Sequence, residues 1–332
     1  MEQLKITKKT LEVSRGFTYT YYTSPAKASK PTVMLFHGWP DSARLWAGFI
    51  NNYLIPNGFG VVAPDCLGYG GTSKPTDPKH YLFNLMAADA IEILDEEKLD
   101  AVISLGHDWG STMCQRLYHF YPSRVSGLVM VNVPYSPPMG NFDLDEVNGM
   151  TRALLGRGLF EYWNFFGSTD GPAIMNRNLE SVYTMAFSDP DSENGADNWT
   201  QPNGACTYIS EGRTQPTLGY ATPEHKADFM ERFGKEPGFH APSCWYKVMV
   251  SKLQNESEKL VKQENMRVSV PHMYWGANQD YACRPEFLKG SVDAGLLPDL
   301  KLIMRDGGHW ALLESPAVFG QDVLDWLQEK YN

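Results

Sequence analysis

The sequence predicts an α/β protein in which helices flank a mostly parallel sheet and a helical segment is inserted into the chain. Short apolar runs alternate with stretches whose apolar residues recur at i, i+3 and i+4 up to about residue 138. The alternation stops there and resumes near residue 267. Repeated strand–helix–strand units favour a parallel sheet that is covered on both faces.

Seven segments are expected to be strands because they are short and either apolar or alternating. They are 17–23, 32–37, 60–65, 101–106, 127–133, 267–276 and 300–305. Three segments between or after them have helical apolar spacing, namely 42–54, 84–99 and 318–331.

The expected organisation is a core made of two separated pieces and one insertion. Residues 1–136 and 256–332 are predicted to form the α/β core, and residues 137–255 a helical cap. Within the cap, 188–223 is rich in Gly, Pro, Asn, Asp and Thr and is predicted to be a long loop. Loops of that length are commonly functional or disordered, so we expect this one to border the entrance to a site.

Composition excludes several classes of protein. The net charge of -10 and the pI of about 5.3 provide no basic footprint for nucleic acid or an anionic membrane. No apolar run approaches the ~20 residues that a membrane-spanning helix needs, and the first ten residues lack the apolar stretch of a signal peptide. The five cysteines form no C-x-x-C or Cys/His pattern, so we expect reduced thiols, a cytoplasmic protein and no metal or other cofactor.

Candidate catalytic residues follow the predicted strands. Ligands in open α/β sheets gather at the carboxyl ends of the strands. Asp108 follows 101–106 in the pattern G-H-D-W-G, Asp280 follows 267–276, and His309 follows 300–305. The pattern resembles G-x-S-x-G, in which a nucleophile occupies a sharp turn between a strand and a helix, and the order is that of nucleophile, acid and histidine.

An aspartate at the turn indicates a particular chemistry. A carboxylate with an ordinary pKa near 3.9 is ionised at neutral pH and needs no base to become a nucleophile. Attack on an sp3 carbon gives an ester of Asp108, which water activated by His309 can hydrolyse while Asp280 orients the histidine. The arrangement suits alkylation followed by ester hydrolysis, and does not suit acyl transfer.

The sequence as a whole resembles the α/β-hydrolase-fold soluble epoxide hydrolases, in particular the microbial type that has no N-terminal phosphatase domain. The resemblance runs from about Phe17 to Trp326 and is carried by H-G-W-P, G-H-D-W-G, Asp280 and G-G-H-W. Two cap segments, FEYWNFFG and GFHAPSCWYK, resemble the tyrosine motifs of the family and give Tyr162 and Tyr246.

The resemblance implies a role for each of these residues in an ether-bond hydrolase. Tyr162 and Tyr246 would bind the epoxide oxygen and protonate it, and the N–H groups of Trp39 and Trp109 would form an oxyanion hole. The substrate-contact residues are expected to be His37, Pro40, Trp109 and Trp310. The partners would be an epoxide and water, without cofactor or metal, and the product a vicinal diol. A monomer is plausible, and detoxification and lipid signalling both remain open.

Other functions remain as alternatives. A haloalkane dehalogenase shares the aspartate and the following tryptophan, but its usual H-G-N-P asparagine is replaced by Trp39. A fluoroacetate dehalogenase would want arginines near the nucleophile, and none directly follows Asp108. A binding protein without activity would not need the full set of residues. A serine esterase is nearly excluded because Ser111 lies off the tip of the turn.

Overall fold

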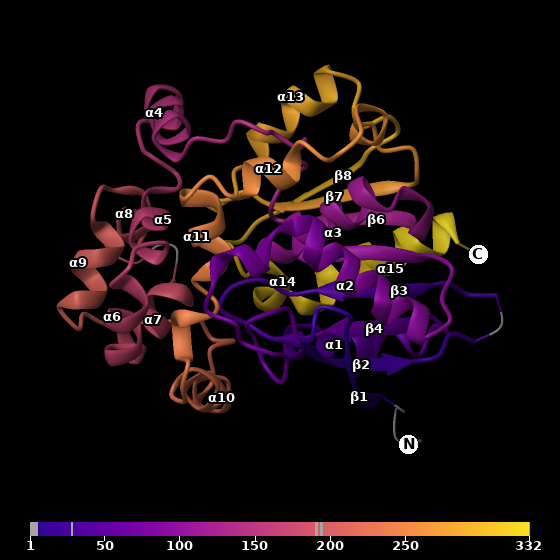
Figure 1. Ribbon diagram of the computed structural model, residues 1–332, viewed down its shortest axis with the longest axis horizontal. Helices are drawn as coiled ribbons and strands as arrows, with labels where there is room; N and C mark the ends of the chain where they lie inside the picture. Colours follow the sequence, from indigo (N-terminus) through magenta and orange to yellow (C-terminus); the bar gives the residue numbers. More distant parts are fainter. Residues whose placement is uncertain (1–5, 28, 190–191, 193–194, 332) are drawn as a thin grey trace.

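A computed structural model describes residues 6–27, 29–189, 192 and 195–331. One sheet of eight strands runs through them in the order β1-β2-β4-β3-β5-β6-β7-β8 (Figure 1). The strands are β1 (Thr7–Glu12), β2 (Thr18–Ser24), β3 (Thr32–Phe36), β4 (Gly60–Pro64), β5 (Val102–His107), β6 (Val125–Val131), β7 (His272–Ala277) and β8 (Lys301–Arg305). β2 pairs antiparallel with β1 and β4, and every pair from β4 to β8 is parallel.

The predicted fold class is therefore confirmed, and each of the seven expected strands is present with shifted ends. β1 was not expected. It is an edge strand with the sequence TKKTLE, and most of its residues are exposed. A strand that buries neither face carries little apolar signal, because edge strands are commonly protected by charge. The strand expected at 267–276 begins five residues later, at His272.

Helices cover both faces of the sheet, which explains why the central strands are apolar throughout. Every residue of β3, β4, β5 and β7 is buried, as parallel strands covered on both sides require. α2 (Phe83–Glu96) packs on α3 (Trp109–Phe120), which contacts β5 and β6. α1 (Ala47–Phe49) contacts α15 (Pro316–Lys330).

Two of the three expected helices are present with small shifts, as α2 and α15. The helix expected at 42–54 is instead three short turns: a 3-10 turn at Ala43–Trp46, α1, and a π turn at Ile50–Leu54. The apolar residues of this segment are nevertheless buried, as the spacing predicted. Examples are Trp46, Phe49 and Leu54.

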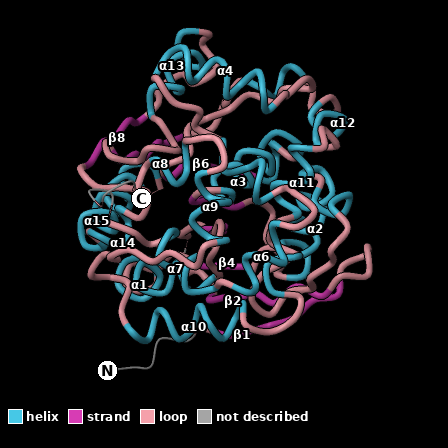
Figure 2. The backbone as a smooth tube through the Cα atoms, turned by 90° about the vertical axis from the view of Figure 1, so that its left-hand side faces the viewer, coloured by secondary structure: helices cyan, strands magenta, loops and turns pink. Residues whose placement is uncertain are grey.

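The insertion lies between two strands that are neighbours in the sheet. β6 ends at Val131 and β7 begins at His272, yet they pair in parallel, so the chain must cross over between them. The crossover contains α4 (Leu144–Leu155), α5 (Glu161–Phe166), α6 (Gly171–Arg177), α7 (Leu179–Ala186), α8 (Asp197–Thr200), α9 (Gly204–Ser210), α10 (Pro223–Phe233), α11 (Cys244–Val250) and α12 (Gln254–Glu258). Figure 1 shows most of these helices gathered on the left of the sheet, and Figure 2 views the molecule from that side. The boundaries at 136 and 255 stay a prediction.

The expectation of a loop over the whole of 188–223 is wrong. Its described residues include α8, α9 and an isolated bridge between Ser188 and Thr217, while 190–191 and 193–194 lie outside the described residues. Each helix is held by a few buried side chains, such as Trp199 on α8 and Ile209 on α9. Helices of four and seven residues are too short to produce a periodic pattern.

The remaining helices, α13 (Leu288–Asp293) and α14 (Ala311–Glu314), follow β7 and β8. Among the helices of the described segments, none is both long and apolar enough to cross a membrane.

Replacing Gly110 by alanine is expected to lower the free energy of unfolding by about 1–3 kcal/mol, the usual cost of overpacking. A Cβ atom at Gly110 would lie 2.0 Å from the carbonyl oxygen of Phe36, because α3 begins against the end of β3. Urea unfolding with linear extrapolation measures the change. Gly149→Ala in α4 is the control, because a Cβ there meets no atom within 4 Å. Equal loss in both variants would contradict the close approach.

Candidate active site

Asp108 occupies the turn between β5 and α3. Its backbone has φ 55° and ψ -126°, a conformation that a residue with a side chain rarely adopts and that is found at functional sites. The turn brings the carboxylate against the segment after β3. At Gly38 in that segment, a Cβ atom would lie 2.3 Å from Oδ1 of Asp108. Only glycine leaves room for the carboxylate at this point.

Backbone N–H groups hold the carboxylate of Asp108. The N–H of Trp39 donates to Oδ1 at 2.7 Å, and the N–H of Trp109, the first residue of α3, also donates to the carboxylate. Burial raises the pKa of Asp108, while His309 and these two N–H groups oppose the rise. The two N–H groups predicted to form the oxyanion hole therefore both bind the carboxylate of Asp108, the predicted nucleophile.

His309 and Asp280 form the other half of the cluster. Nδ1 of His309 lies 2.8 Å from Oδ2 of Asp280, and Nε2 lies 3.8 Å from Oδ2 of Asp108. The first distance is a hydrogen bond and the second is too long for one. Nε2 of His309 thus faces the nucleophile without being bound to it.

Asp280 is buried and fully hydrogen-bonded. Oδ1 accepts the N–H groups of Ala282 and Cys283, and Oδ2 accepts Nδ2 of Asn132 at 2.8 Å. Burial alone would raise the pKa of Asp280, but His309 and the surrounding N–H donors outweigh it and hold the pKa well below its ordinary value. Asp280 therefore stays charged beside His309.

Asn132 is a site residue that the sequence reasoning missed. The expected strand 127–133 placed it inside a strand, whereas β6 ends at Val131 and Asn132 is the first residue beyond it. Its φ is 62°, and the hydroxyl of Tyr274 donates to its carbonyl oxygen at 2.8 Å. The sequence signal that could have identified Asn132 is a polar residue directly after a strand, the same signal that identified Asp108, Asp280 and His309.

The charge on His309 depends on Asp280. Burial disfavours the imidazolium, but the Asp280 carboxylate outweighs burial and raises the pKa of His309. Nε2 of His107 lies 2.9 Å from the carbonyl oxygen of His309, and burial lowers the pKa of His107 to about 3. A neutral His107 therefore donates to the backbone of the catalytic loop.

Tyr162 and Tyr246 come from α5 and α11 and meet above Asp108. Their ring centroids are 5.9 Å apart, and both line a cavity with Asp108 and His309. Burial, followed by the nearby Asp108 for Tyr162 and by Tyr162 itself for Tyr246, raises the pKa of each phenol well above its ordinary value. Both hydroxyls therefore keep their protons at neutral pH.

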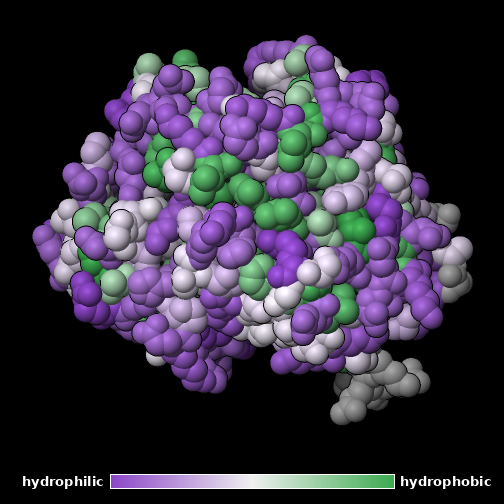
Figure 3. Space-filling view, in the orientation of Figure 1, coloured by the Kyte–Doolittle hydropathy of each residue, from purple (hydrophilic) through white to green (hydrophobic). Residues whose placement is uncertain are grey.

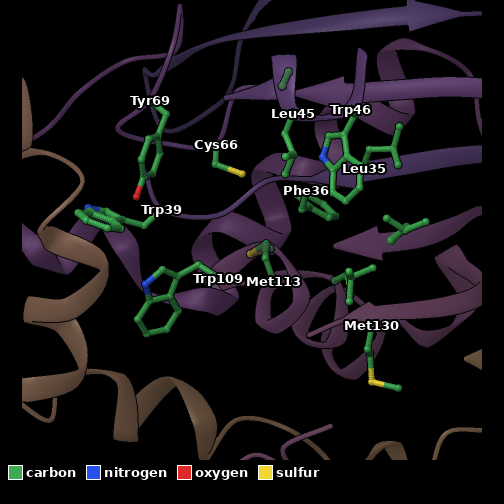
Figure 4. Close-up of a cluster of buried hydrophobic side chains, with 14 of the residues drawn as sticks. Leu35, Phe36, Trp39, Leu45, Trp46, Cys66, Tyr69, Trp109, Met113 and Met130 are labelled. Carbon is green, nitrogen blue, oxygen red and sulfur yellow. The ribbon is translucent and has the colours of Figure 1, made fainter. Parts of the chain in front are cut away.

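Two cavities meet at Asp108. The smaller, of about 30 Å³, has walls that include Trp39, Trp199 and Trp310. The Nε1 of Trp310 donates to the carbonyl oxygen of Ala186 at 2.7 Å, which fixes that wall to the cap. Figure 4 shows the indoles of Trp39 and Trp109 at the end of a buried apolar cluster.

The larger cavity, of about 450 Å³, contains Trp109 and extends between the cap and the second piece of the core. Met139 and Met150 lie along it and are 43% and 49% exposed, so it reaches the surface. Figure 3 shows the upper outline of the molecule notched between the regions of α4 and α13, which both contribute to the lining.

The expected substrate contacts of His37 and Pro40 are not supported. Nδ1 of His37 bonds the carbonyl oxygen of Gly38, and Nε2 accepts the N–H of Cys66 at 2.9 Å. Both ring nitrogens are used to fix loops. Neither His37 nor Pro40 is among the described residues that line the two cavities, whereas Trp109 and Trp310 are.

One set of side chains in the described ranges could be considered for a metal, namely Asp280, Cys283 and His309, whose ligand atoms lie within 4.8 Å of one another. Both oxygens of Asp280 already accept N–H groups, and one of these comes from the His309 ring. The donor set is therefore used within the acid–histidine pair. The five cysteines are free thiols.

Comparison with known families agrees with this geometry. Residues 31–316 match the family described as alpha/beta hydrolase fold. The chain therefore belongs to the alpha/beta hydrolase fold family.

Within that family the chain is similar to proteins named epoxide hydrolases, as the sequence motifs predicted. It is 30% identical to Epoxide hydrolase B of Mycobacterium tuberculosis, covering 92% of this chain and 93% of that one. It is 27% identical to Epoxide hydrolase srdG of Neurospora crassa, covering 95% and 93%.

Two further comparisons differ in how much of the relative the chain covers. The chain is 27% identical to Bifunctional epoxide hydrolase 2 of Mus musculus over 90% of its own length but 52% of that protein, so it spans about half of that relative. The crystal structure of Epoxide Hydrolase A from Mycobacterium thermoresistibile superposes with a TM-score of 0.80 at 24% identity, covering 98% of both chains. The second likeness supports the fold alone.

Replacing Asp280 by asparagine is expected to lower the pKa of His309. In the unaltered protein the carboxylate raises that pKa above 6.5 against the effect of burial, and without the carboxylate burial prevails. Titration of the imidazole followed by NMR measures the shift. Asp306→Asn is the matched control, because Asp306 is exposed and bonds Asn278 instead. An equal shift in both variants would show that the ion pair does not set the pKa.

Proposed function

We propose that this protein is an epoxide hydrolase that works through an alkyl ester of Asp108. The observation that carries the proposal is the combination of a carboxylate at the turn, a histidine Nε2 3.8 Å from it, and two protonated tyrosines in the same cavity. The named relatives support the same activity. Catalysis would need no metal or other cofactor.

In the first half of the reaction, Asp108 attacks an epoxide carbon. Oδ1 is held by the N–H of Trp39, so Oδ2 is the free nucleophile and Oδ1 becomes the carbonyl oxygen of the ester. The carbon–oxygen bond of the epoxide breaks, and the departing oxygen takes a proton from Tyr162 or Tyr246. An alkoxide leaves poorly without that proton, and such acid assistance contributes roughly 100- to 10,000-fold.

In the second half, His309 removes a proton from water, which attacks the ester carbon of Asp108. The charge that develops on Oδ1 is met by the N–H groups of Trp39 and Trp109, which already point at that oxygen or its carboxylate. Asp280 stabilises the imidazolium. Collapse expels the diol oxygen, which takes the proton from His309 and leaves Asp108 as the neutral acid. Asp108 then loses that proton and the phenolate left by the first half regains one, so the carboxylate and both phenols are restored.

The tyrosines favour an epoxide over an alkyl halide as the substrate. A halide ion leaves without a proton, so two phenols whose pKa values are raised well above the ordinary range would have no task. A serine esterase has no nucleophile here, because the hydroxyl of Ser111 donates to the carbonyl oxygen of Val133 at 2.8 Å.

The wider setting of the reaction remains a matter of proposal. We infer a cytoplasmic location from the reduced cysteines and propose an epoxide and water as the partners. A monomer is the simplest working assumption, and detoxification and lipid signalling are both compatible with the site.

The variant His309→Gln is expected to stall as the covalent ester, because the ester forms but its hydrolysis lacks a base. Incubation with styrene oxide should increase the intact mass by the mass of the whole epoxide, and peptide mapping should place the gain on Asp108. The double variant that also carries Asp108→Asn is the control and should show no gain. A gain of the alkyl group alone, found only with a haloalkane, would make the protein a dehalogenase.

Replacing Tyr162 and Tyr246 together by phenylalanine is expected to slow formation of the Asp108 ester by roughly 100- to 10,000-fold, since the leaving oxygen then has no acid. Each single variant should lose less, because one phenol remains. Single-turnover rates of ester formation measure this. Tyr69→Phe is the control, because Tyr69 is equally buried but lies outside the lining of both cavities. An unchanged rate in the double variant would remove the tyrosines from the mechanism.

A further inference from the structure

We infer that the substrate is an epoxide with one long apolar substituent and, on the other side, only hydrogen or a methyl group. This inference rests on the proposed function and adds the shape of the substrate. It follows from the unequal volumes of the two cavities that Asp108 lines, about 30 Å³ and about 450 Å³.

Both cavities belong to one site. Asp108, Tyr162 and Ala282 line each of them, so an epoxide ring bound between the nucleophile and Tyr162 sends one substituent into each cavity. The epoxide cannot turn both substituents into the larger cavity, because its reacting carbon must face Oδ2 of Asp108 while its oxygen faces the phenols.

The smaller cavity cannot take a chain. A cavity needs about 10–15 Å³ to hold one water molecule, whereas pockets that bind small ligands are commonly about 300–1,000 Å³. A volume of about 30 Å³ therefore accommodates about two water molecules or one small group. The water that hydrolyses the ester would also occupy this cavity.

The larger cavity fits an extended apolar group. Its volume of about 450 Å³ lies within the range of ligand pockets, and its lining includes Phe142, Met249 and Phe287. The charged side chains in the lining other than Asp108 are already paired. Arg116 binds Glu258 through two hydrogen bonds of 2.8 and 2.7 Å, and Arg284 binds Glu286.

Trp199 is the specificity-determining residue that keeps the smaller cavity small. Its indole lies edge-on to Tyr162 and Trp39, with ring centroids 4.9 and 6.1 Å away. It is 9% exposed, and the side chain of Tyr281, which also lines the smaller cavity, lies within hydrogen-bonding reach of it. Contacts with neighbouring rings hold the indole in the wall, so its truncation opens the smaller cavity.

The test compares two isomers with the same number of carbon atoms, 1,2-epoxyoctane and trans-4,5-epoxyoctane. The ratio of their kcat/KM values would be measured in the unaltered protein, in Trp199→Ala and in Trp199→Phe. Because the isomers differ in intrinsic reactivity, the change in the ratio between variants decides the matter. Phe233→Ala is the matched control, since Phe233 is a similarly buried aromatic residue of the cap but lines neither cavity.

We expect the unaltered protein to favour the terminal epoxide, and Trp199→Ala to reduce that preference at least about tenfold, since a single methylene in an apolar pocket is worth about 10- to 200-fold. Trp199→Phe should be intermediate and Phe233→Ala unchanged. An equal change in Phe233→Ala, or no change in Trp199→Ala, would overturn the inference while ester formation on Asp108 continues. Failure of both isomers to form any ester in His309→Gln would instead overturn the proposed function.

Discussion

The site depends on one backbone constraint, the left-handed turn at Asp108. The φ of 55° directs the carboxylate away from the sheet, and the helix that follows brings the N–H of Trp109 to it. The turn closes only because the neighbouring backbones approach at Gly38 and Gly110, where a Cβ would meet an atom at 2.3 and 2.0 Å. The strain of the turn is offset by the two N–H groups that bind the carboxylate.

The other polar groups of the site are brought together by the parallel register of the sheet. β5, β6, β7 and β8 are consecutive neighbours that run in the same direction, so the residues after them meet at one edge. Asn132 after β6 binds Asp280 after β7, which binds His309 after β8. Each bond crosses from one strand end to the next, and the chain of bonds fixes the distance of His309 from Asp108.

This logic also explains what the sequence could predict. Asp108, Asp280 and His309 were predicted because each is a polar residue that follows a recognisable strand, which is a local pattern. Asn132 was missed because the apolar run continued past the true end of β6. The substrate contact of His37 stays a prediction without support from the structure, since backbone groups occupy both ring nitrogens, which the sequence cannot show.

Features created by tertiary contacts were harder to predict. β1 has no apolar face, and α8 is too short to be periodic, yet α8 supplies Trp199 to the site. Its place in the wall is set by rings from α5 and from the loop after β3, which lie far apart in the sequence. No local sequence pattern predicts contacts between rings from such distant segments.

The aromatic wall has an electrostatic consequence as well as a steric one. Tryptophan and tyrosine rings exclude water from around Asp108, which weakens the solvation of every charge there. The same burial raises the pKa of Asp108, Tyr162 and Tyr246, so the nucleophile is poorly solvated and the acids remain protonated. Burial alone would lower the pKa of His309, but the charged carboxylate of Asp280 beside it raises that pKa instead. A pocket with room for little water can therefore hold a carboxylate anion and two protonated phenols together, with Asp280 and His309 at its edge, where the proposed mechanism needs a base.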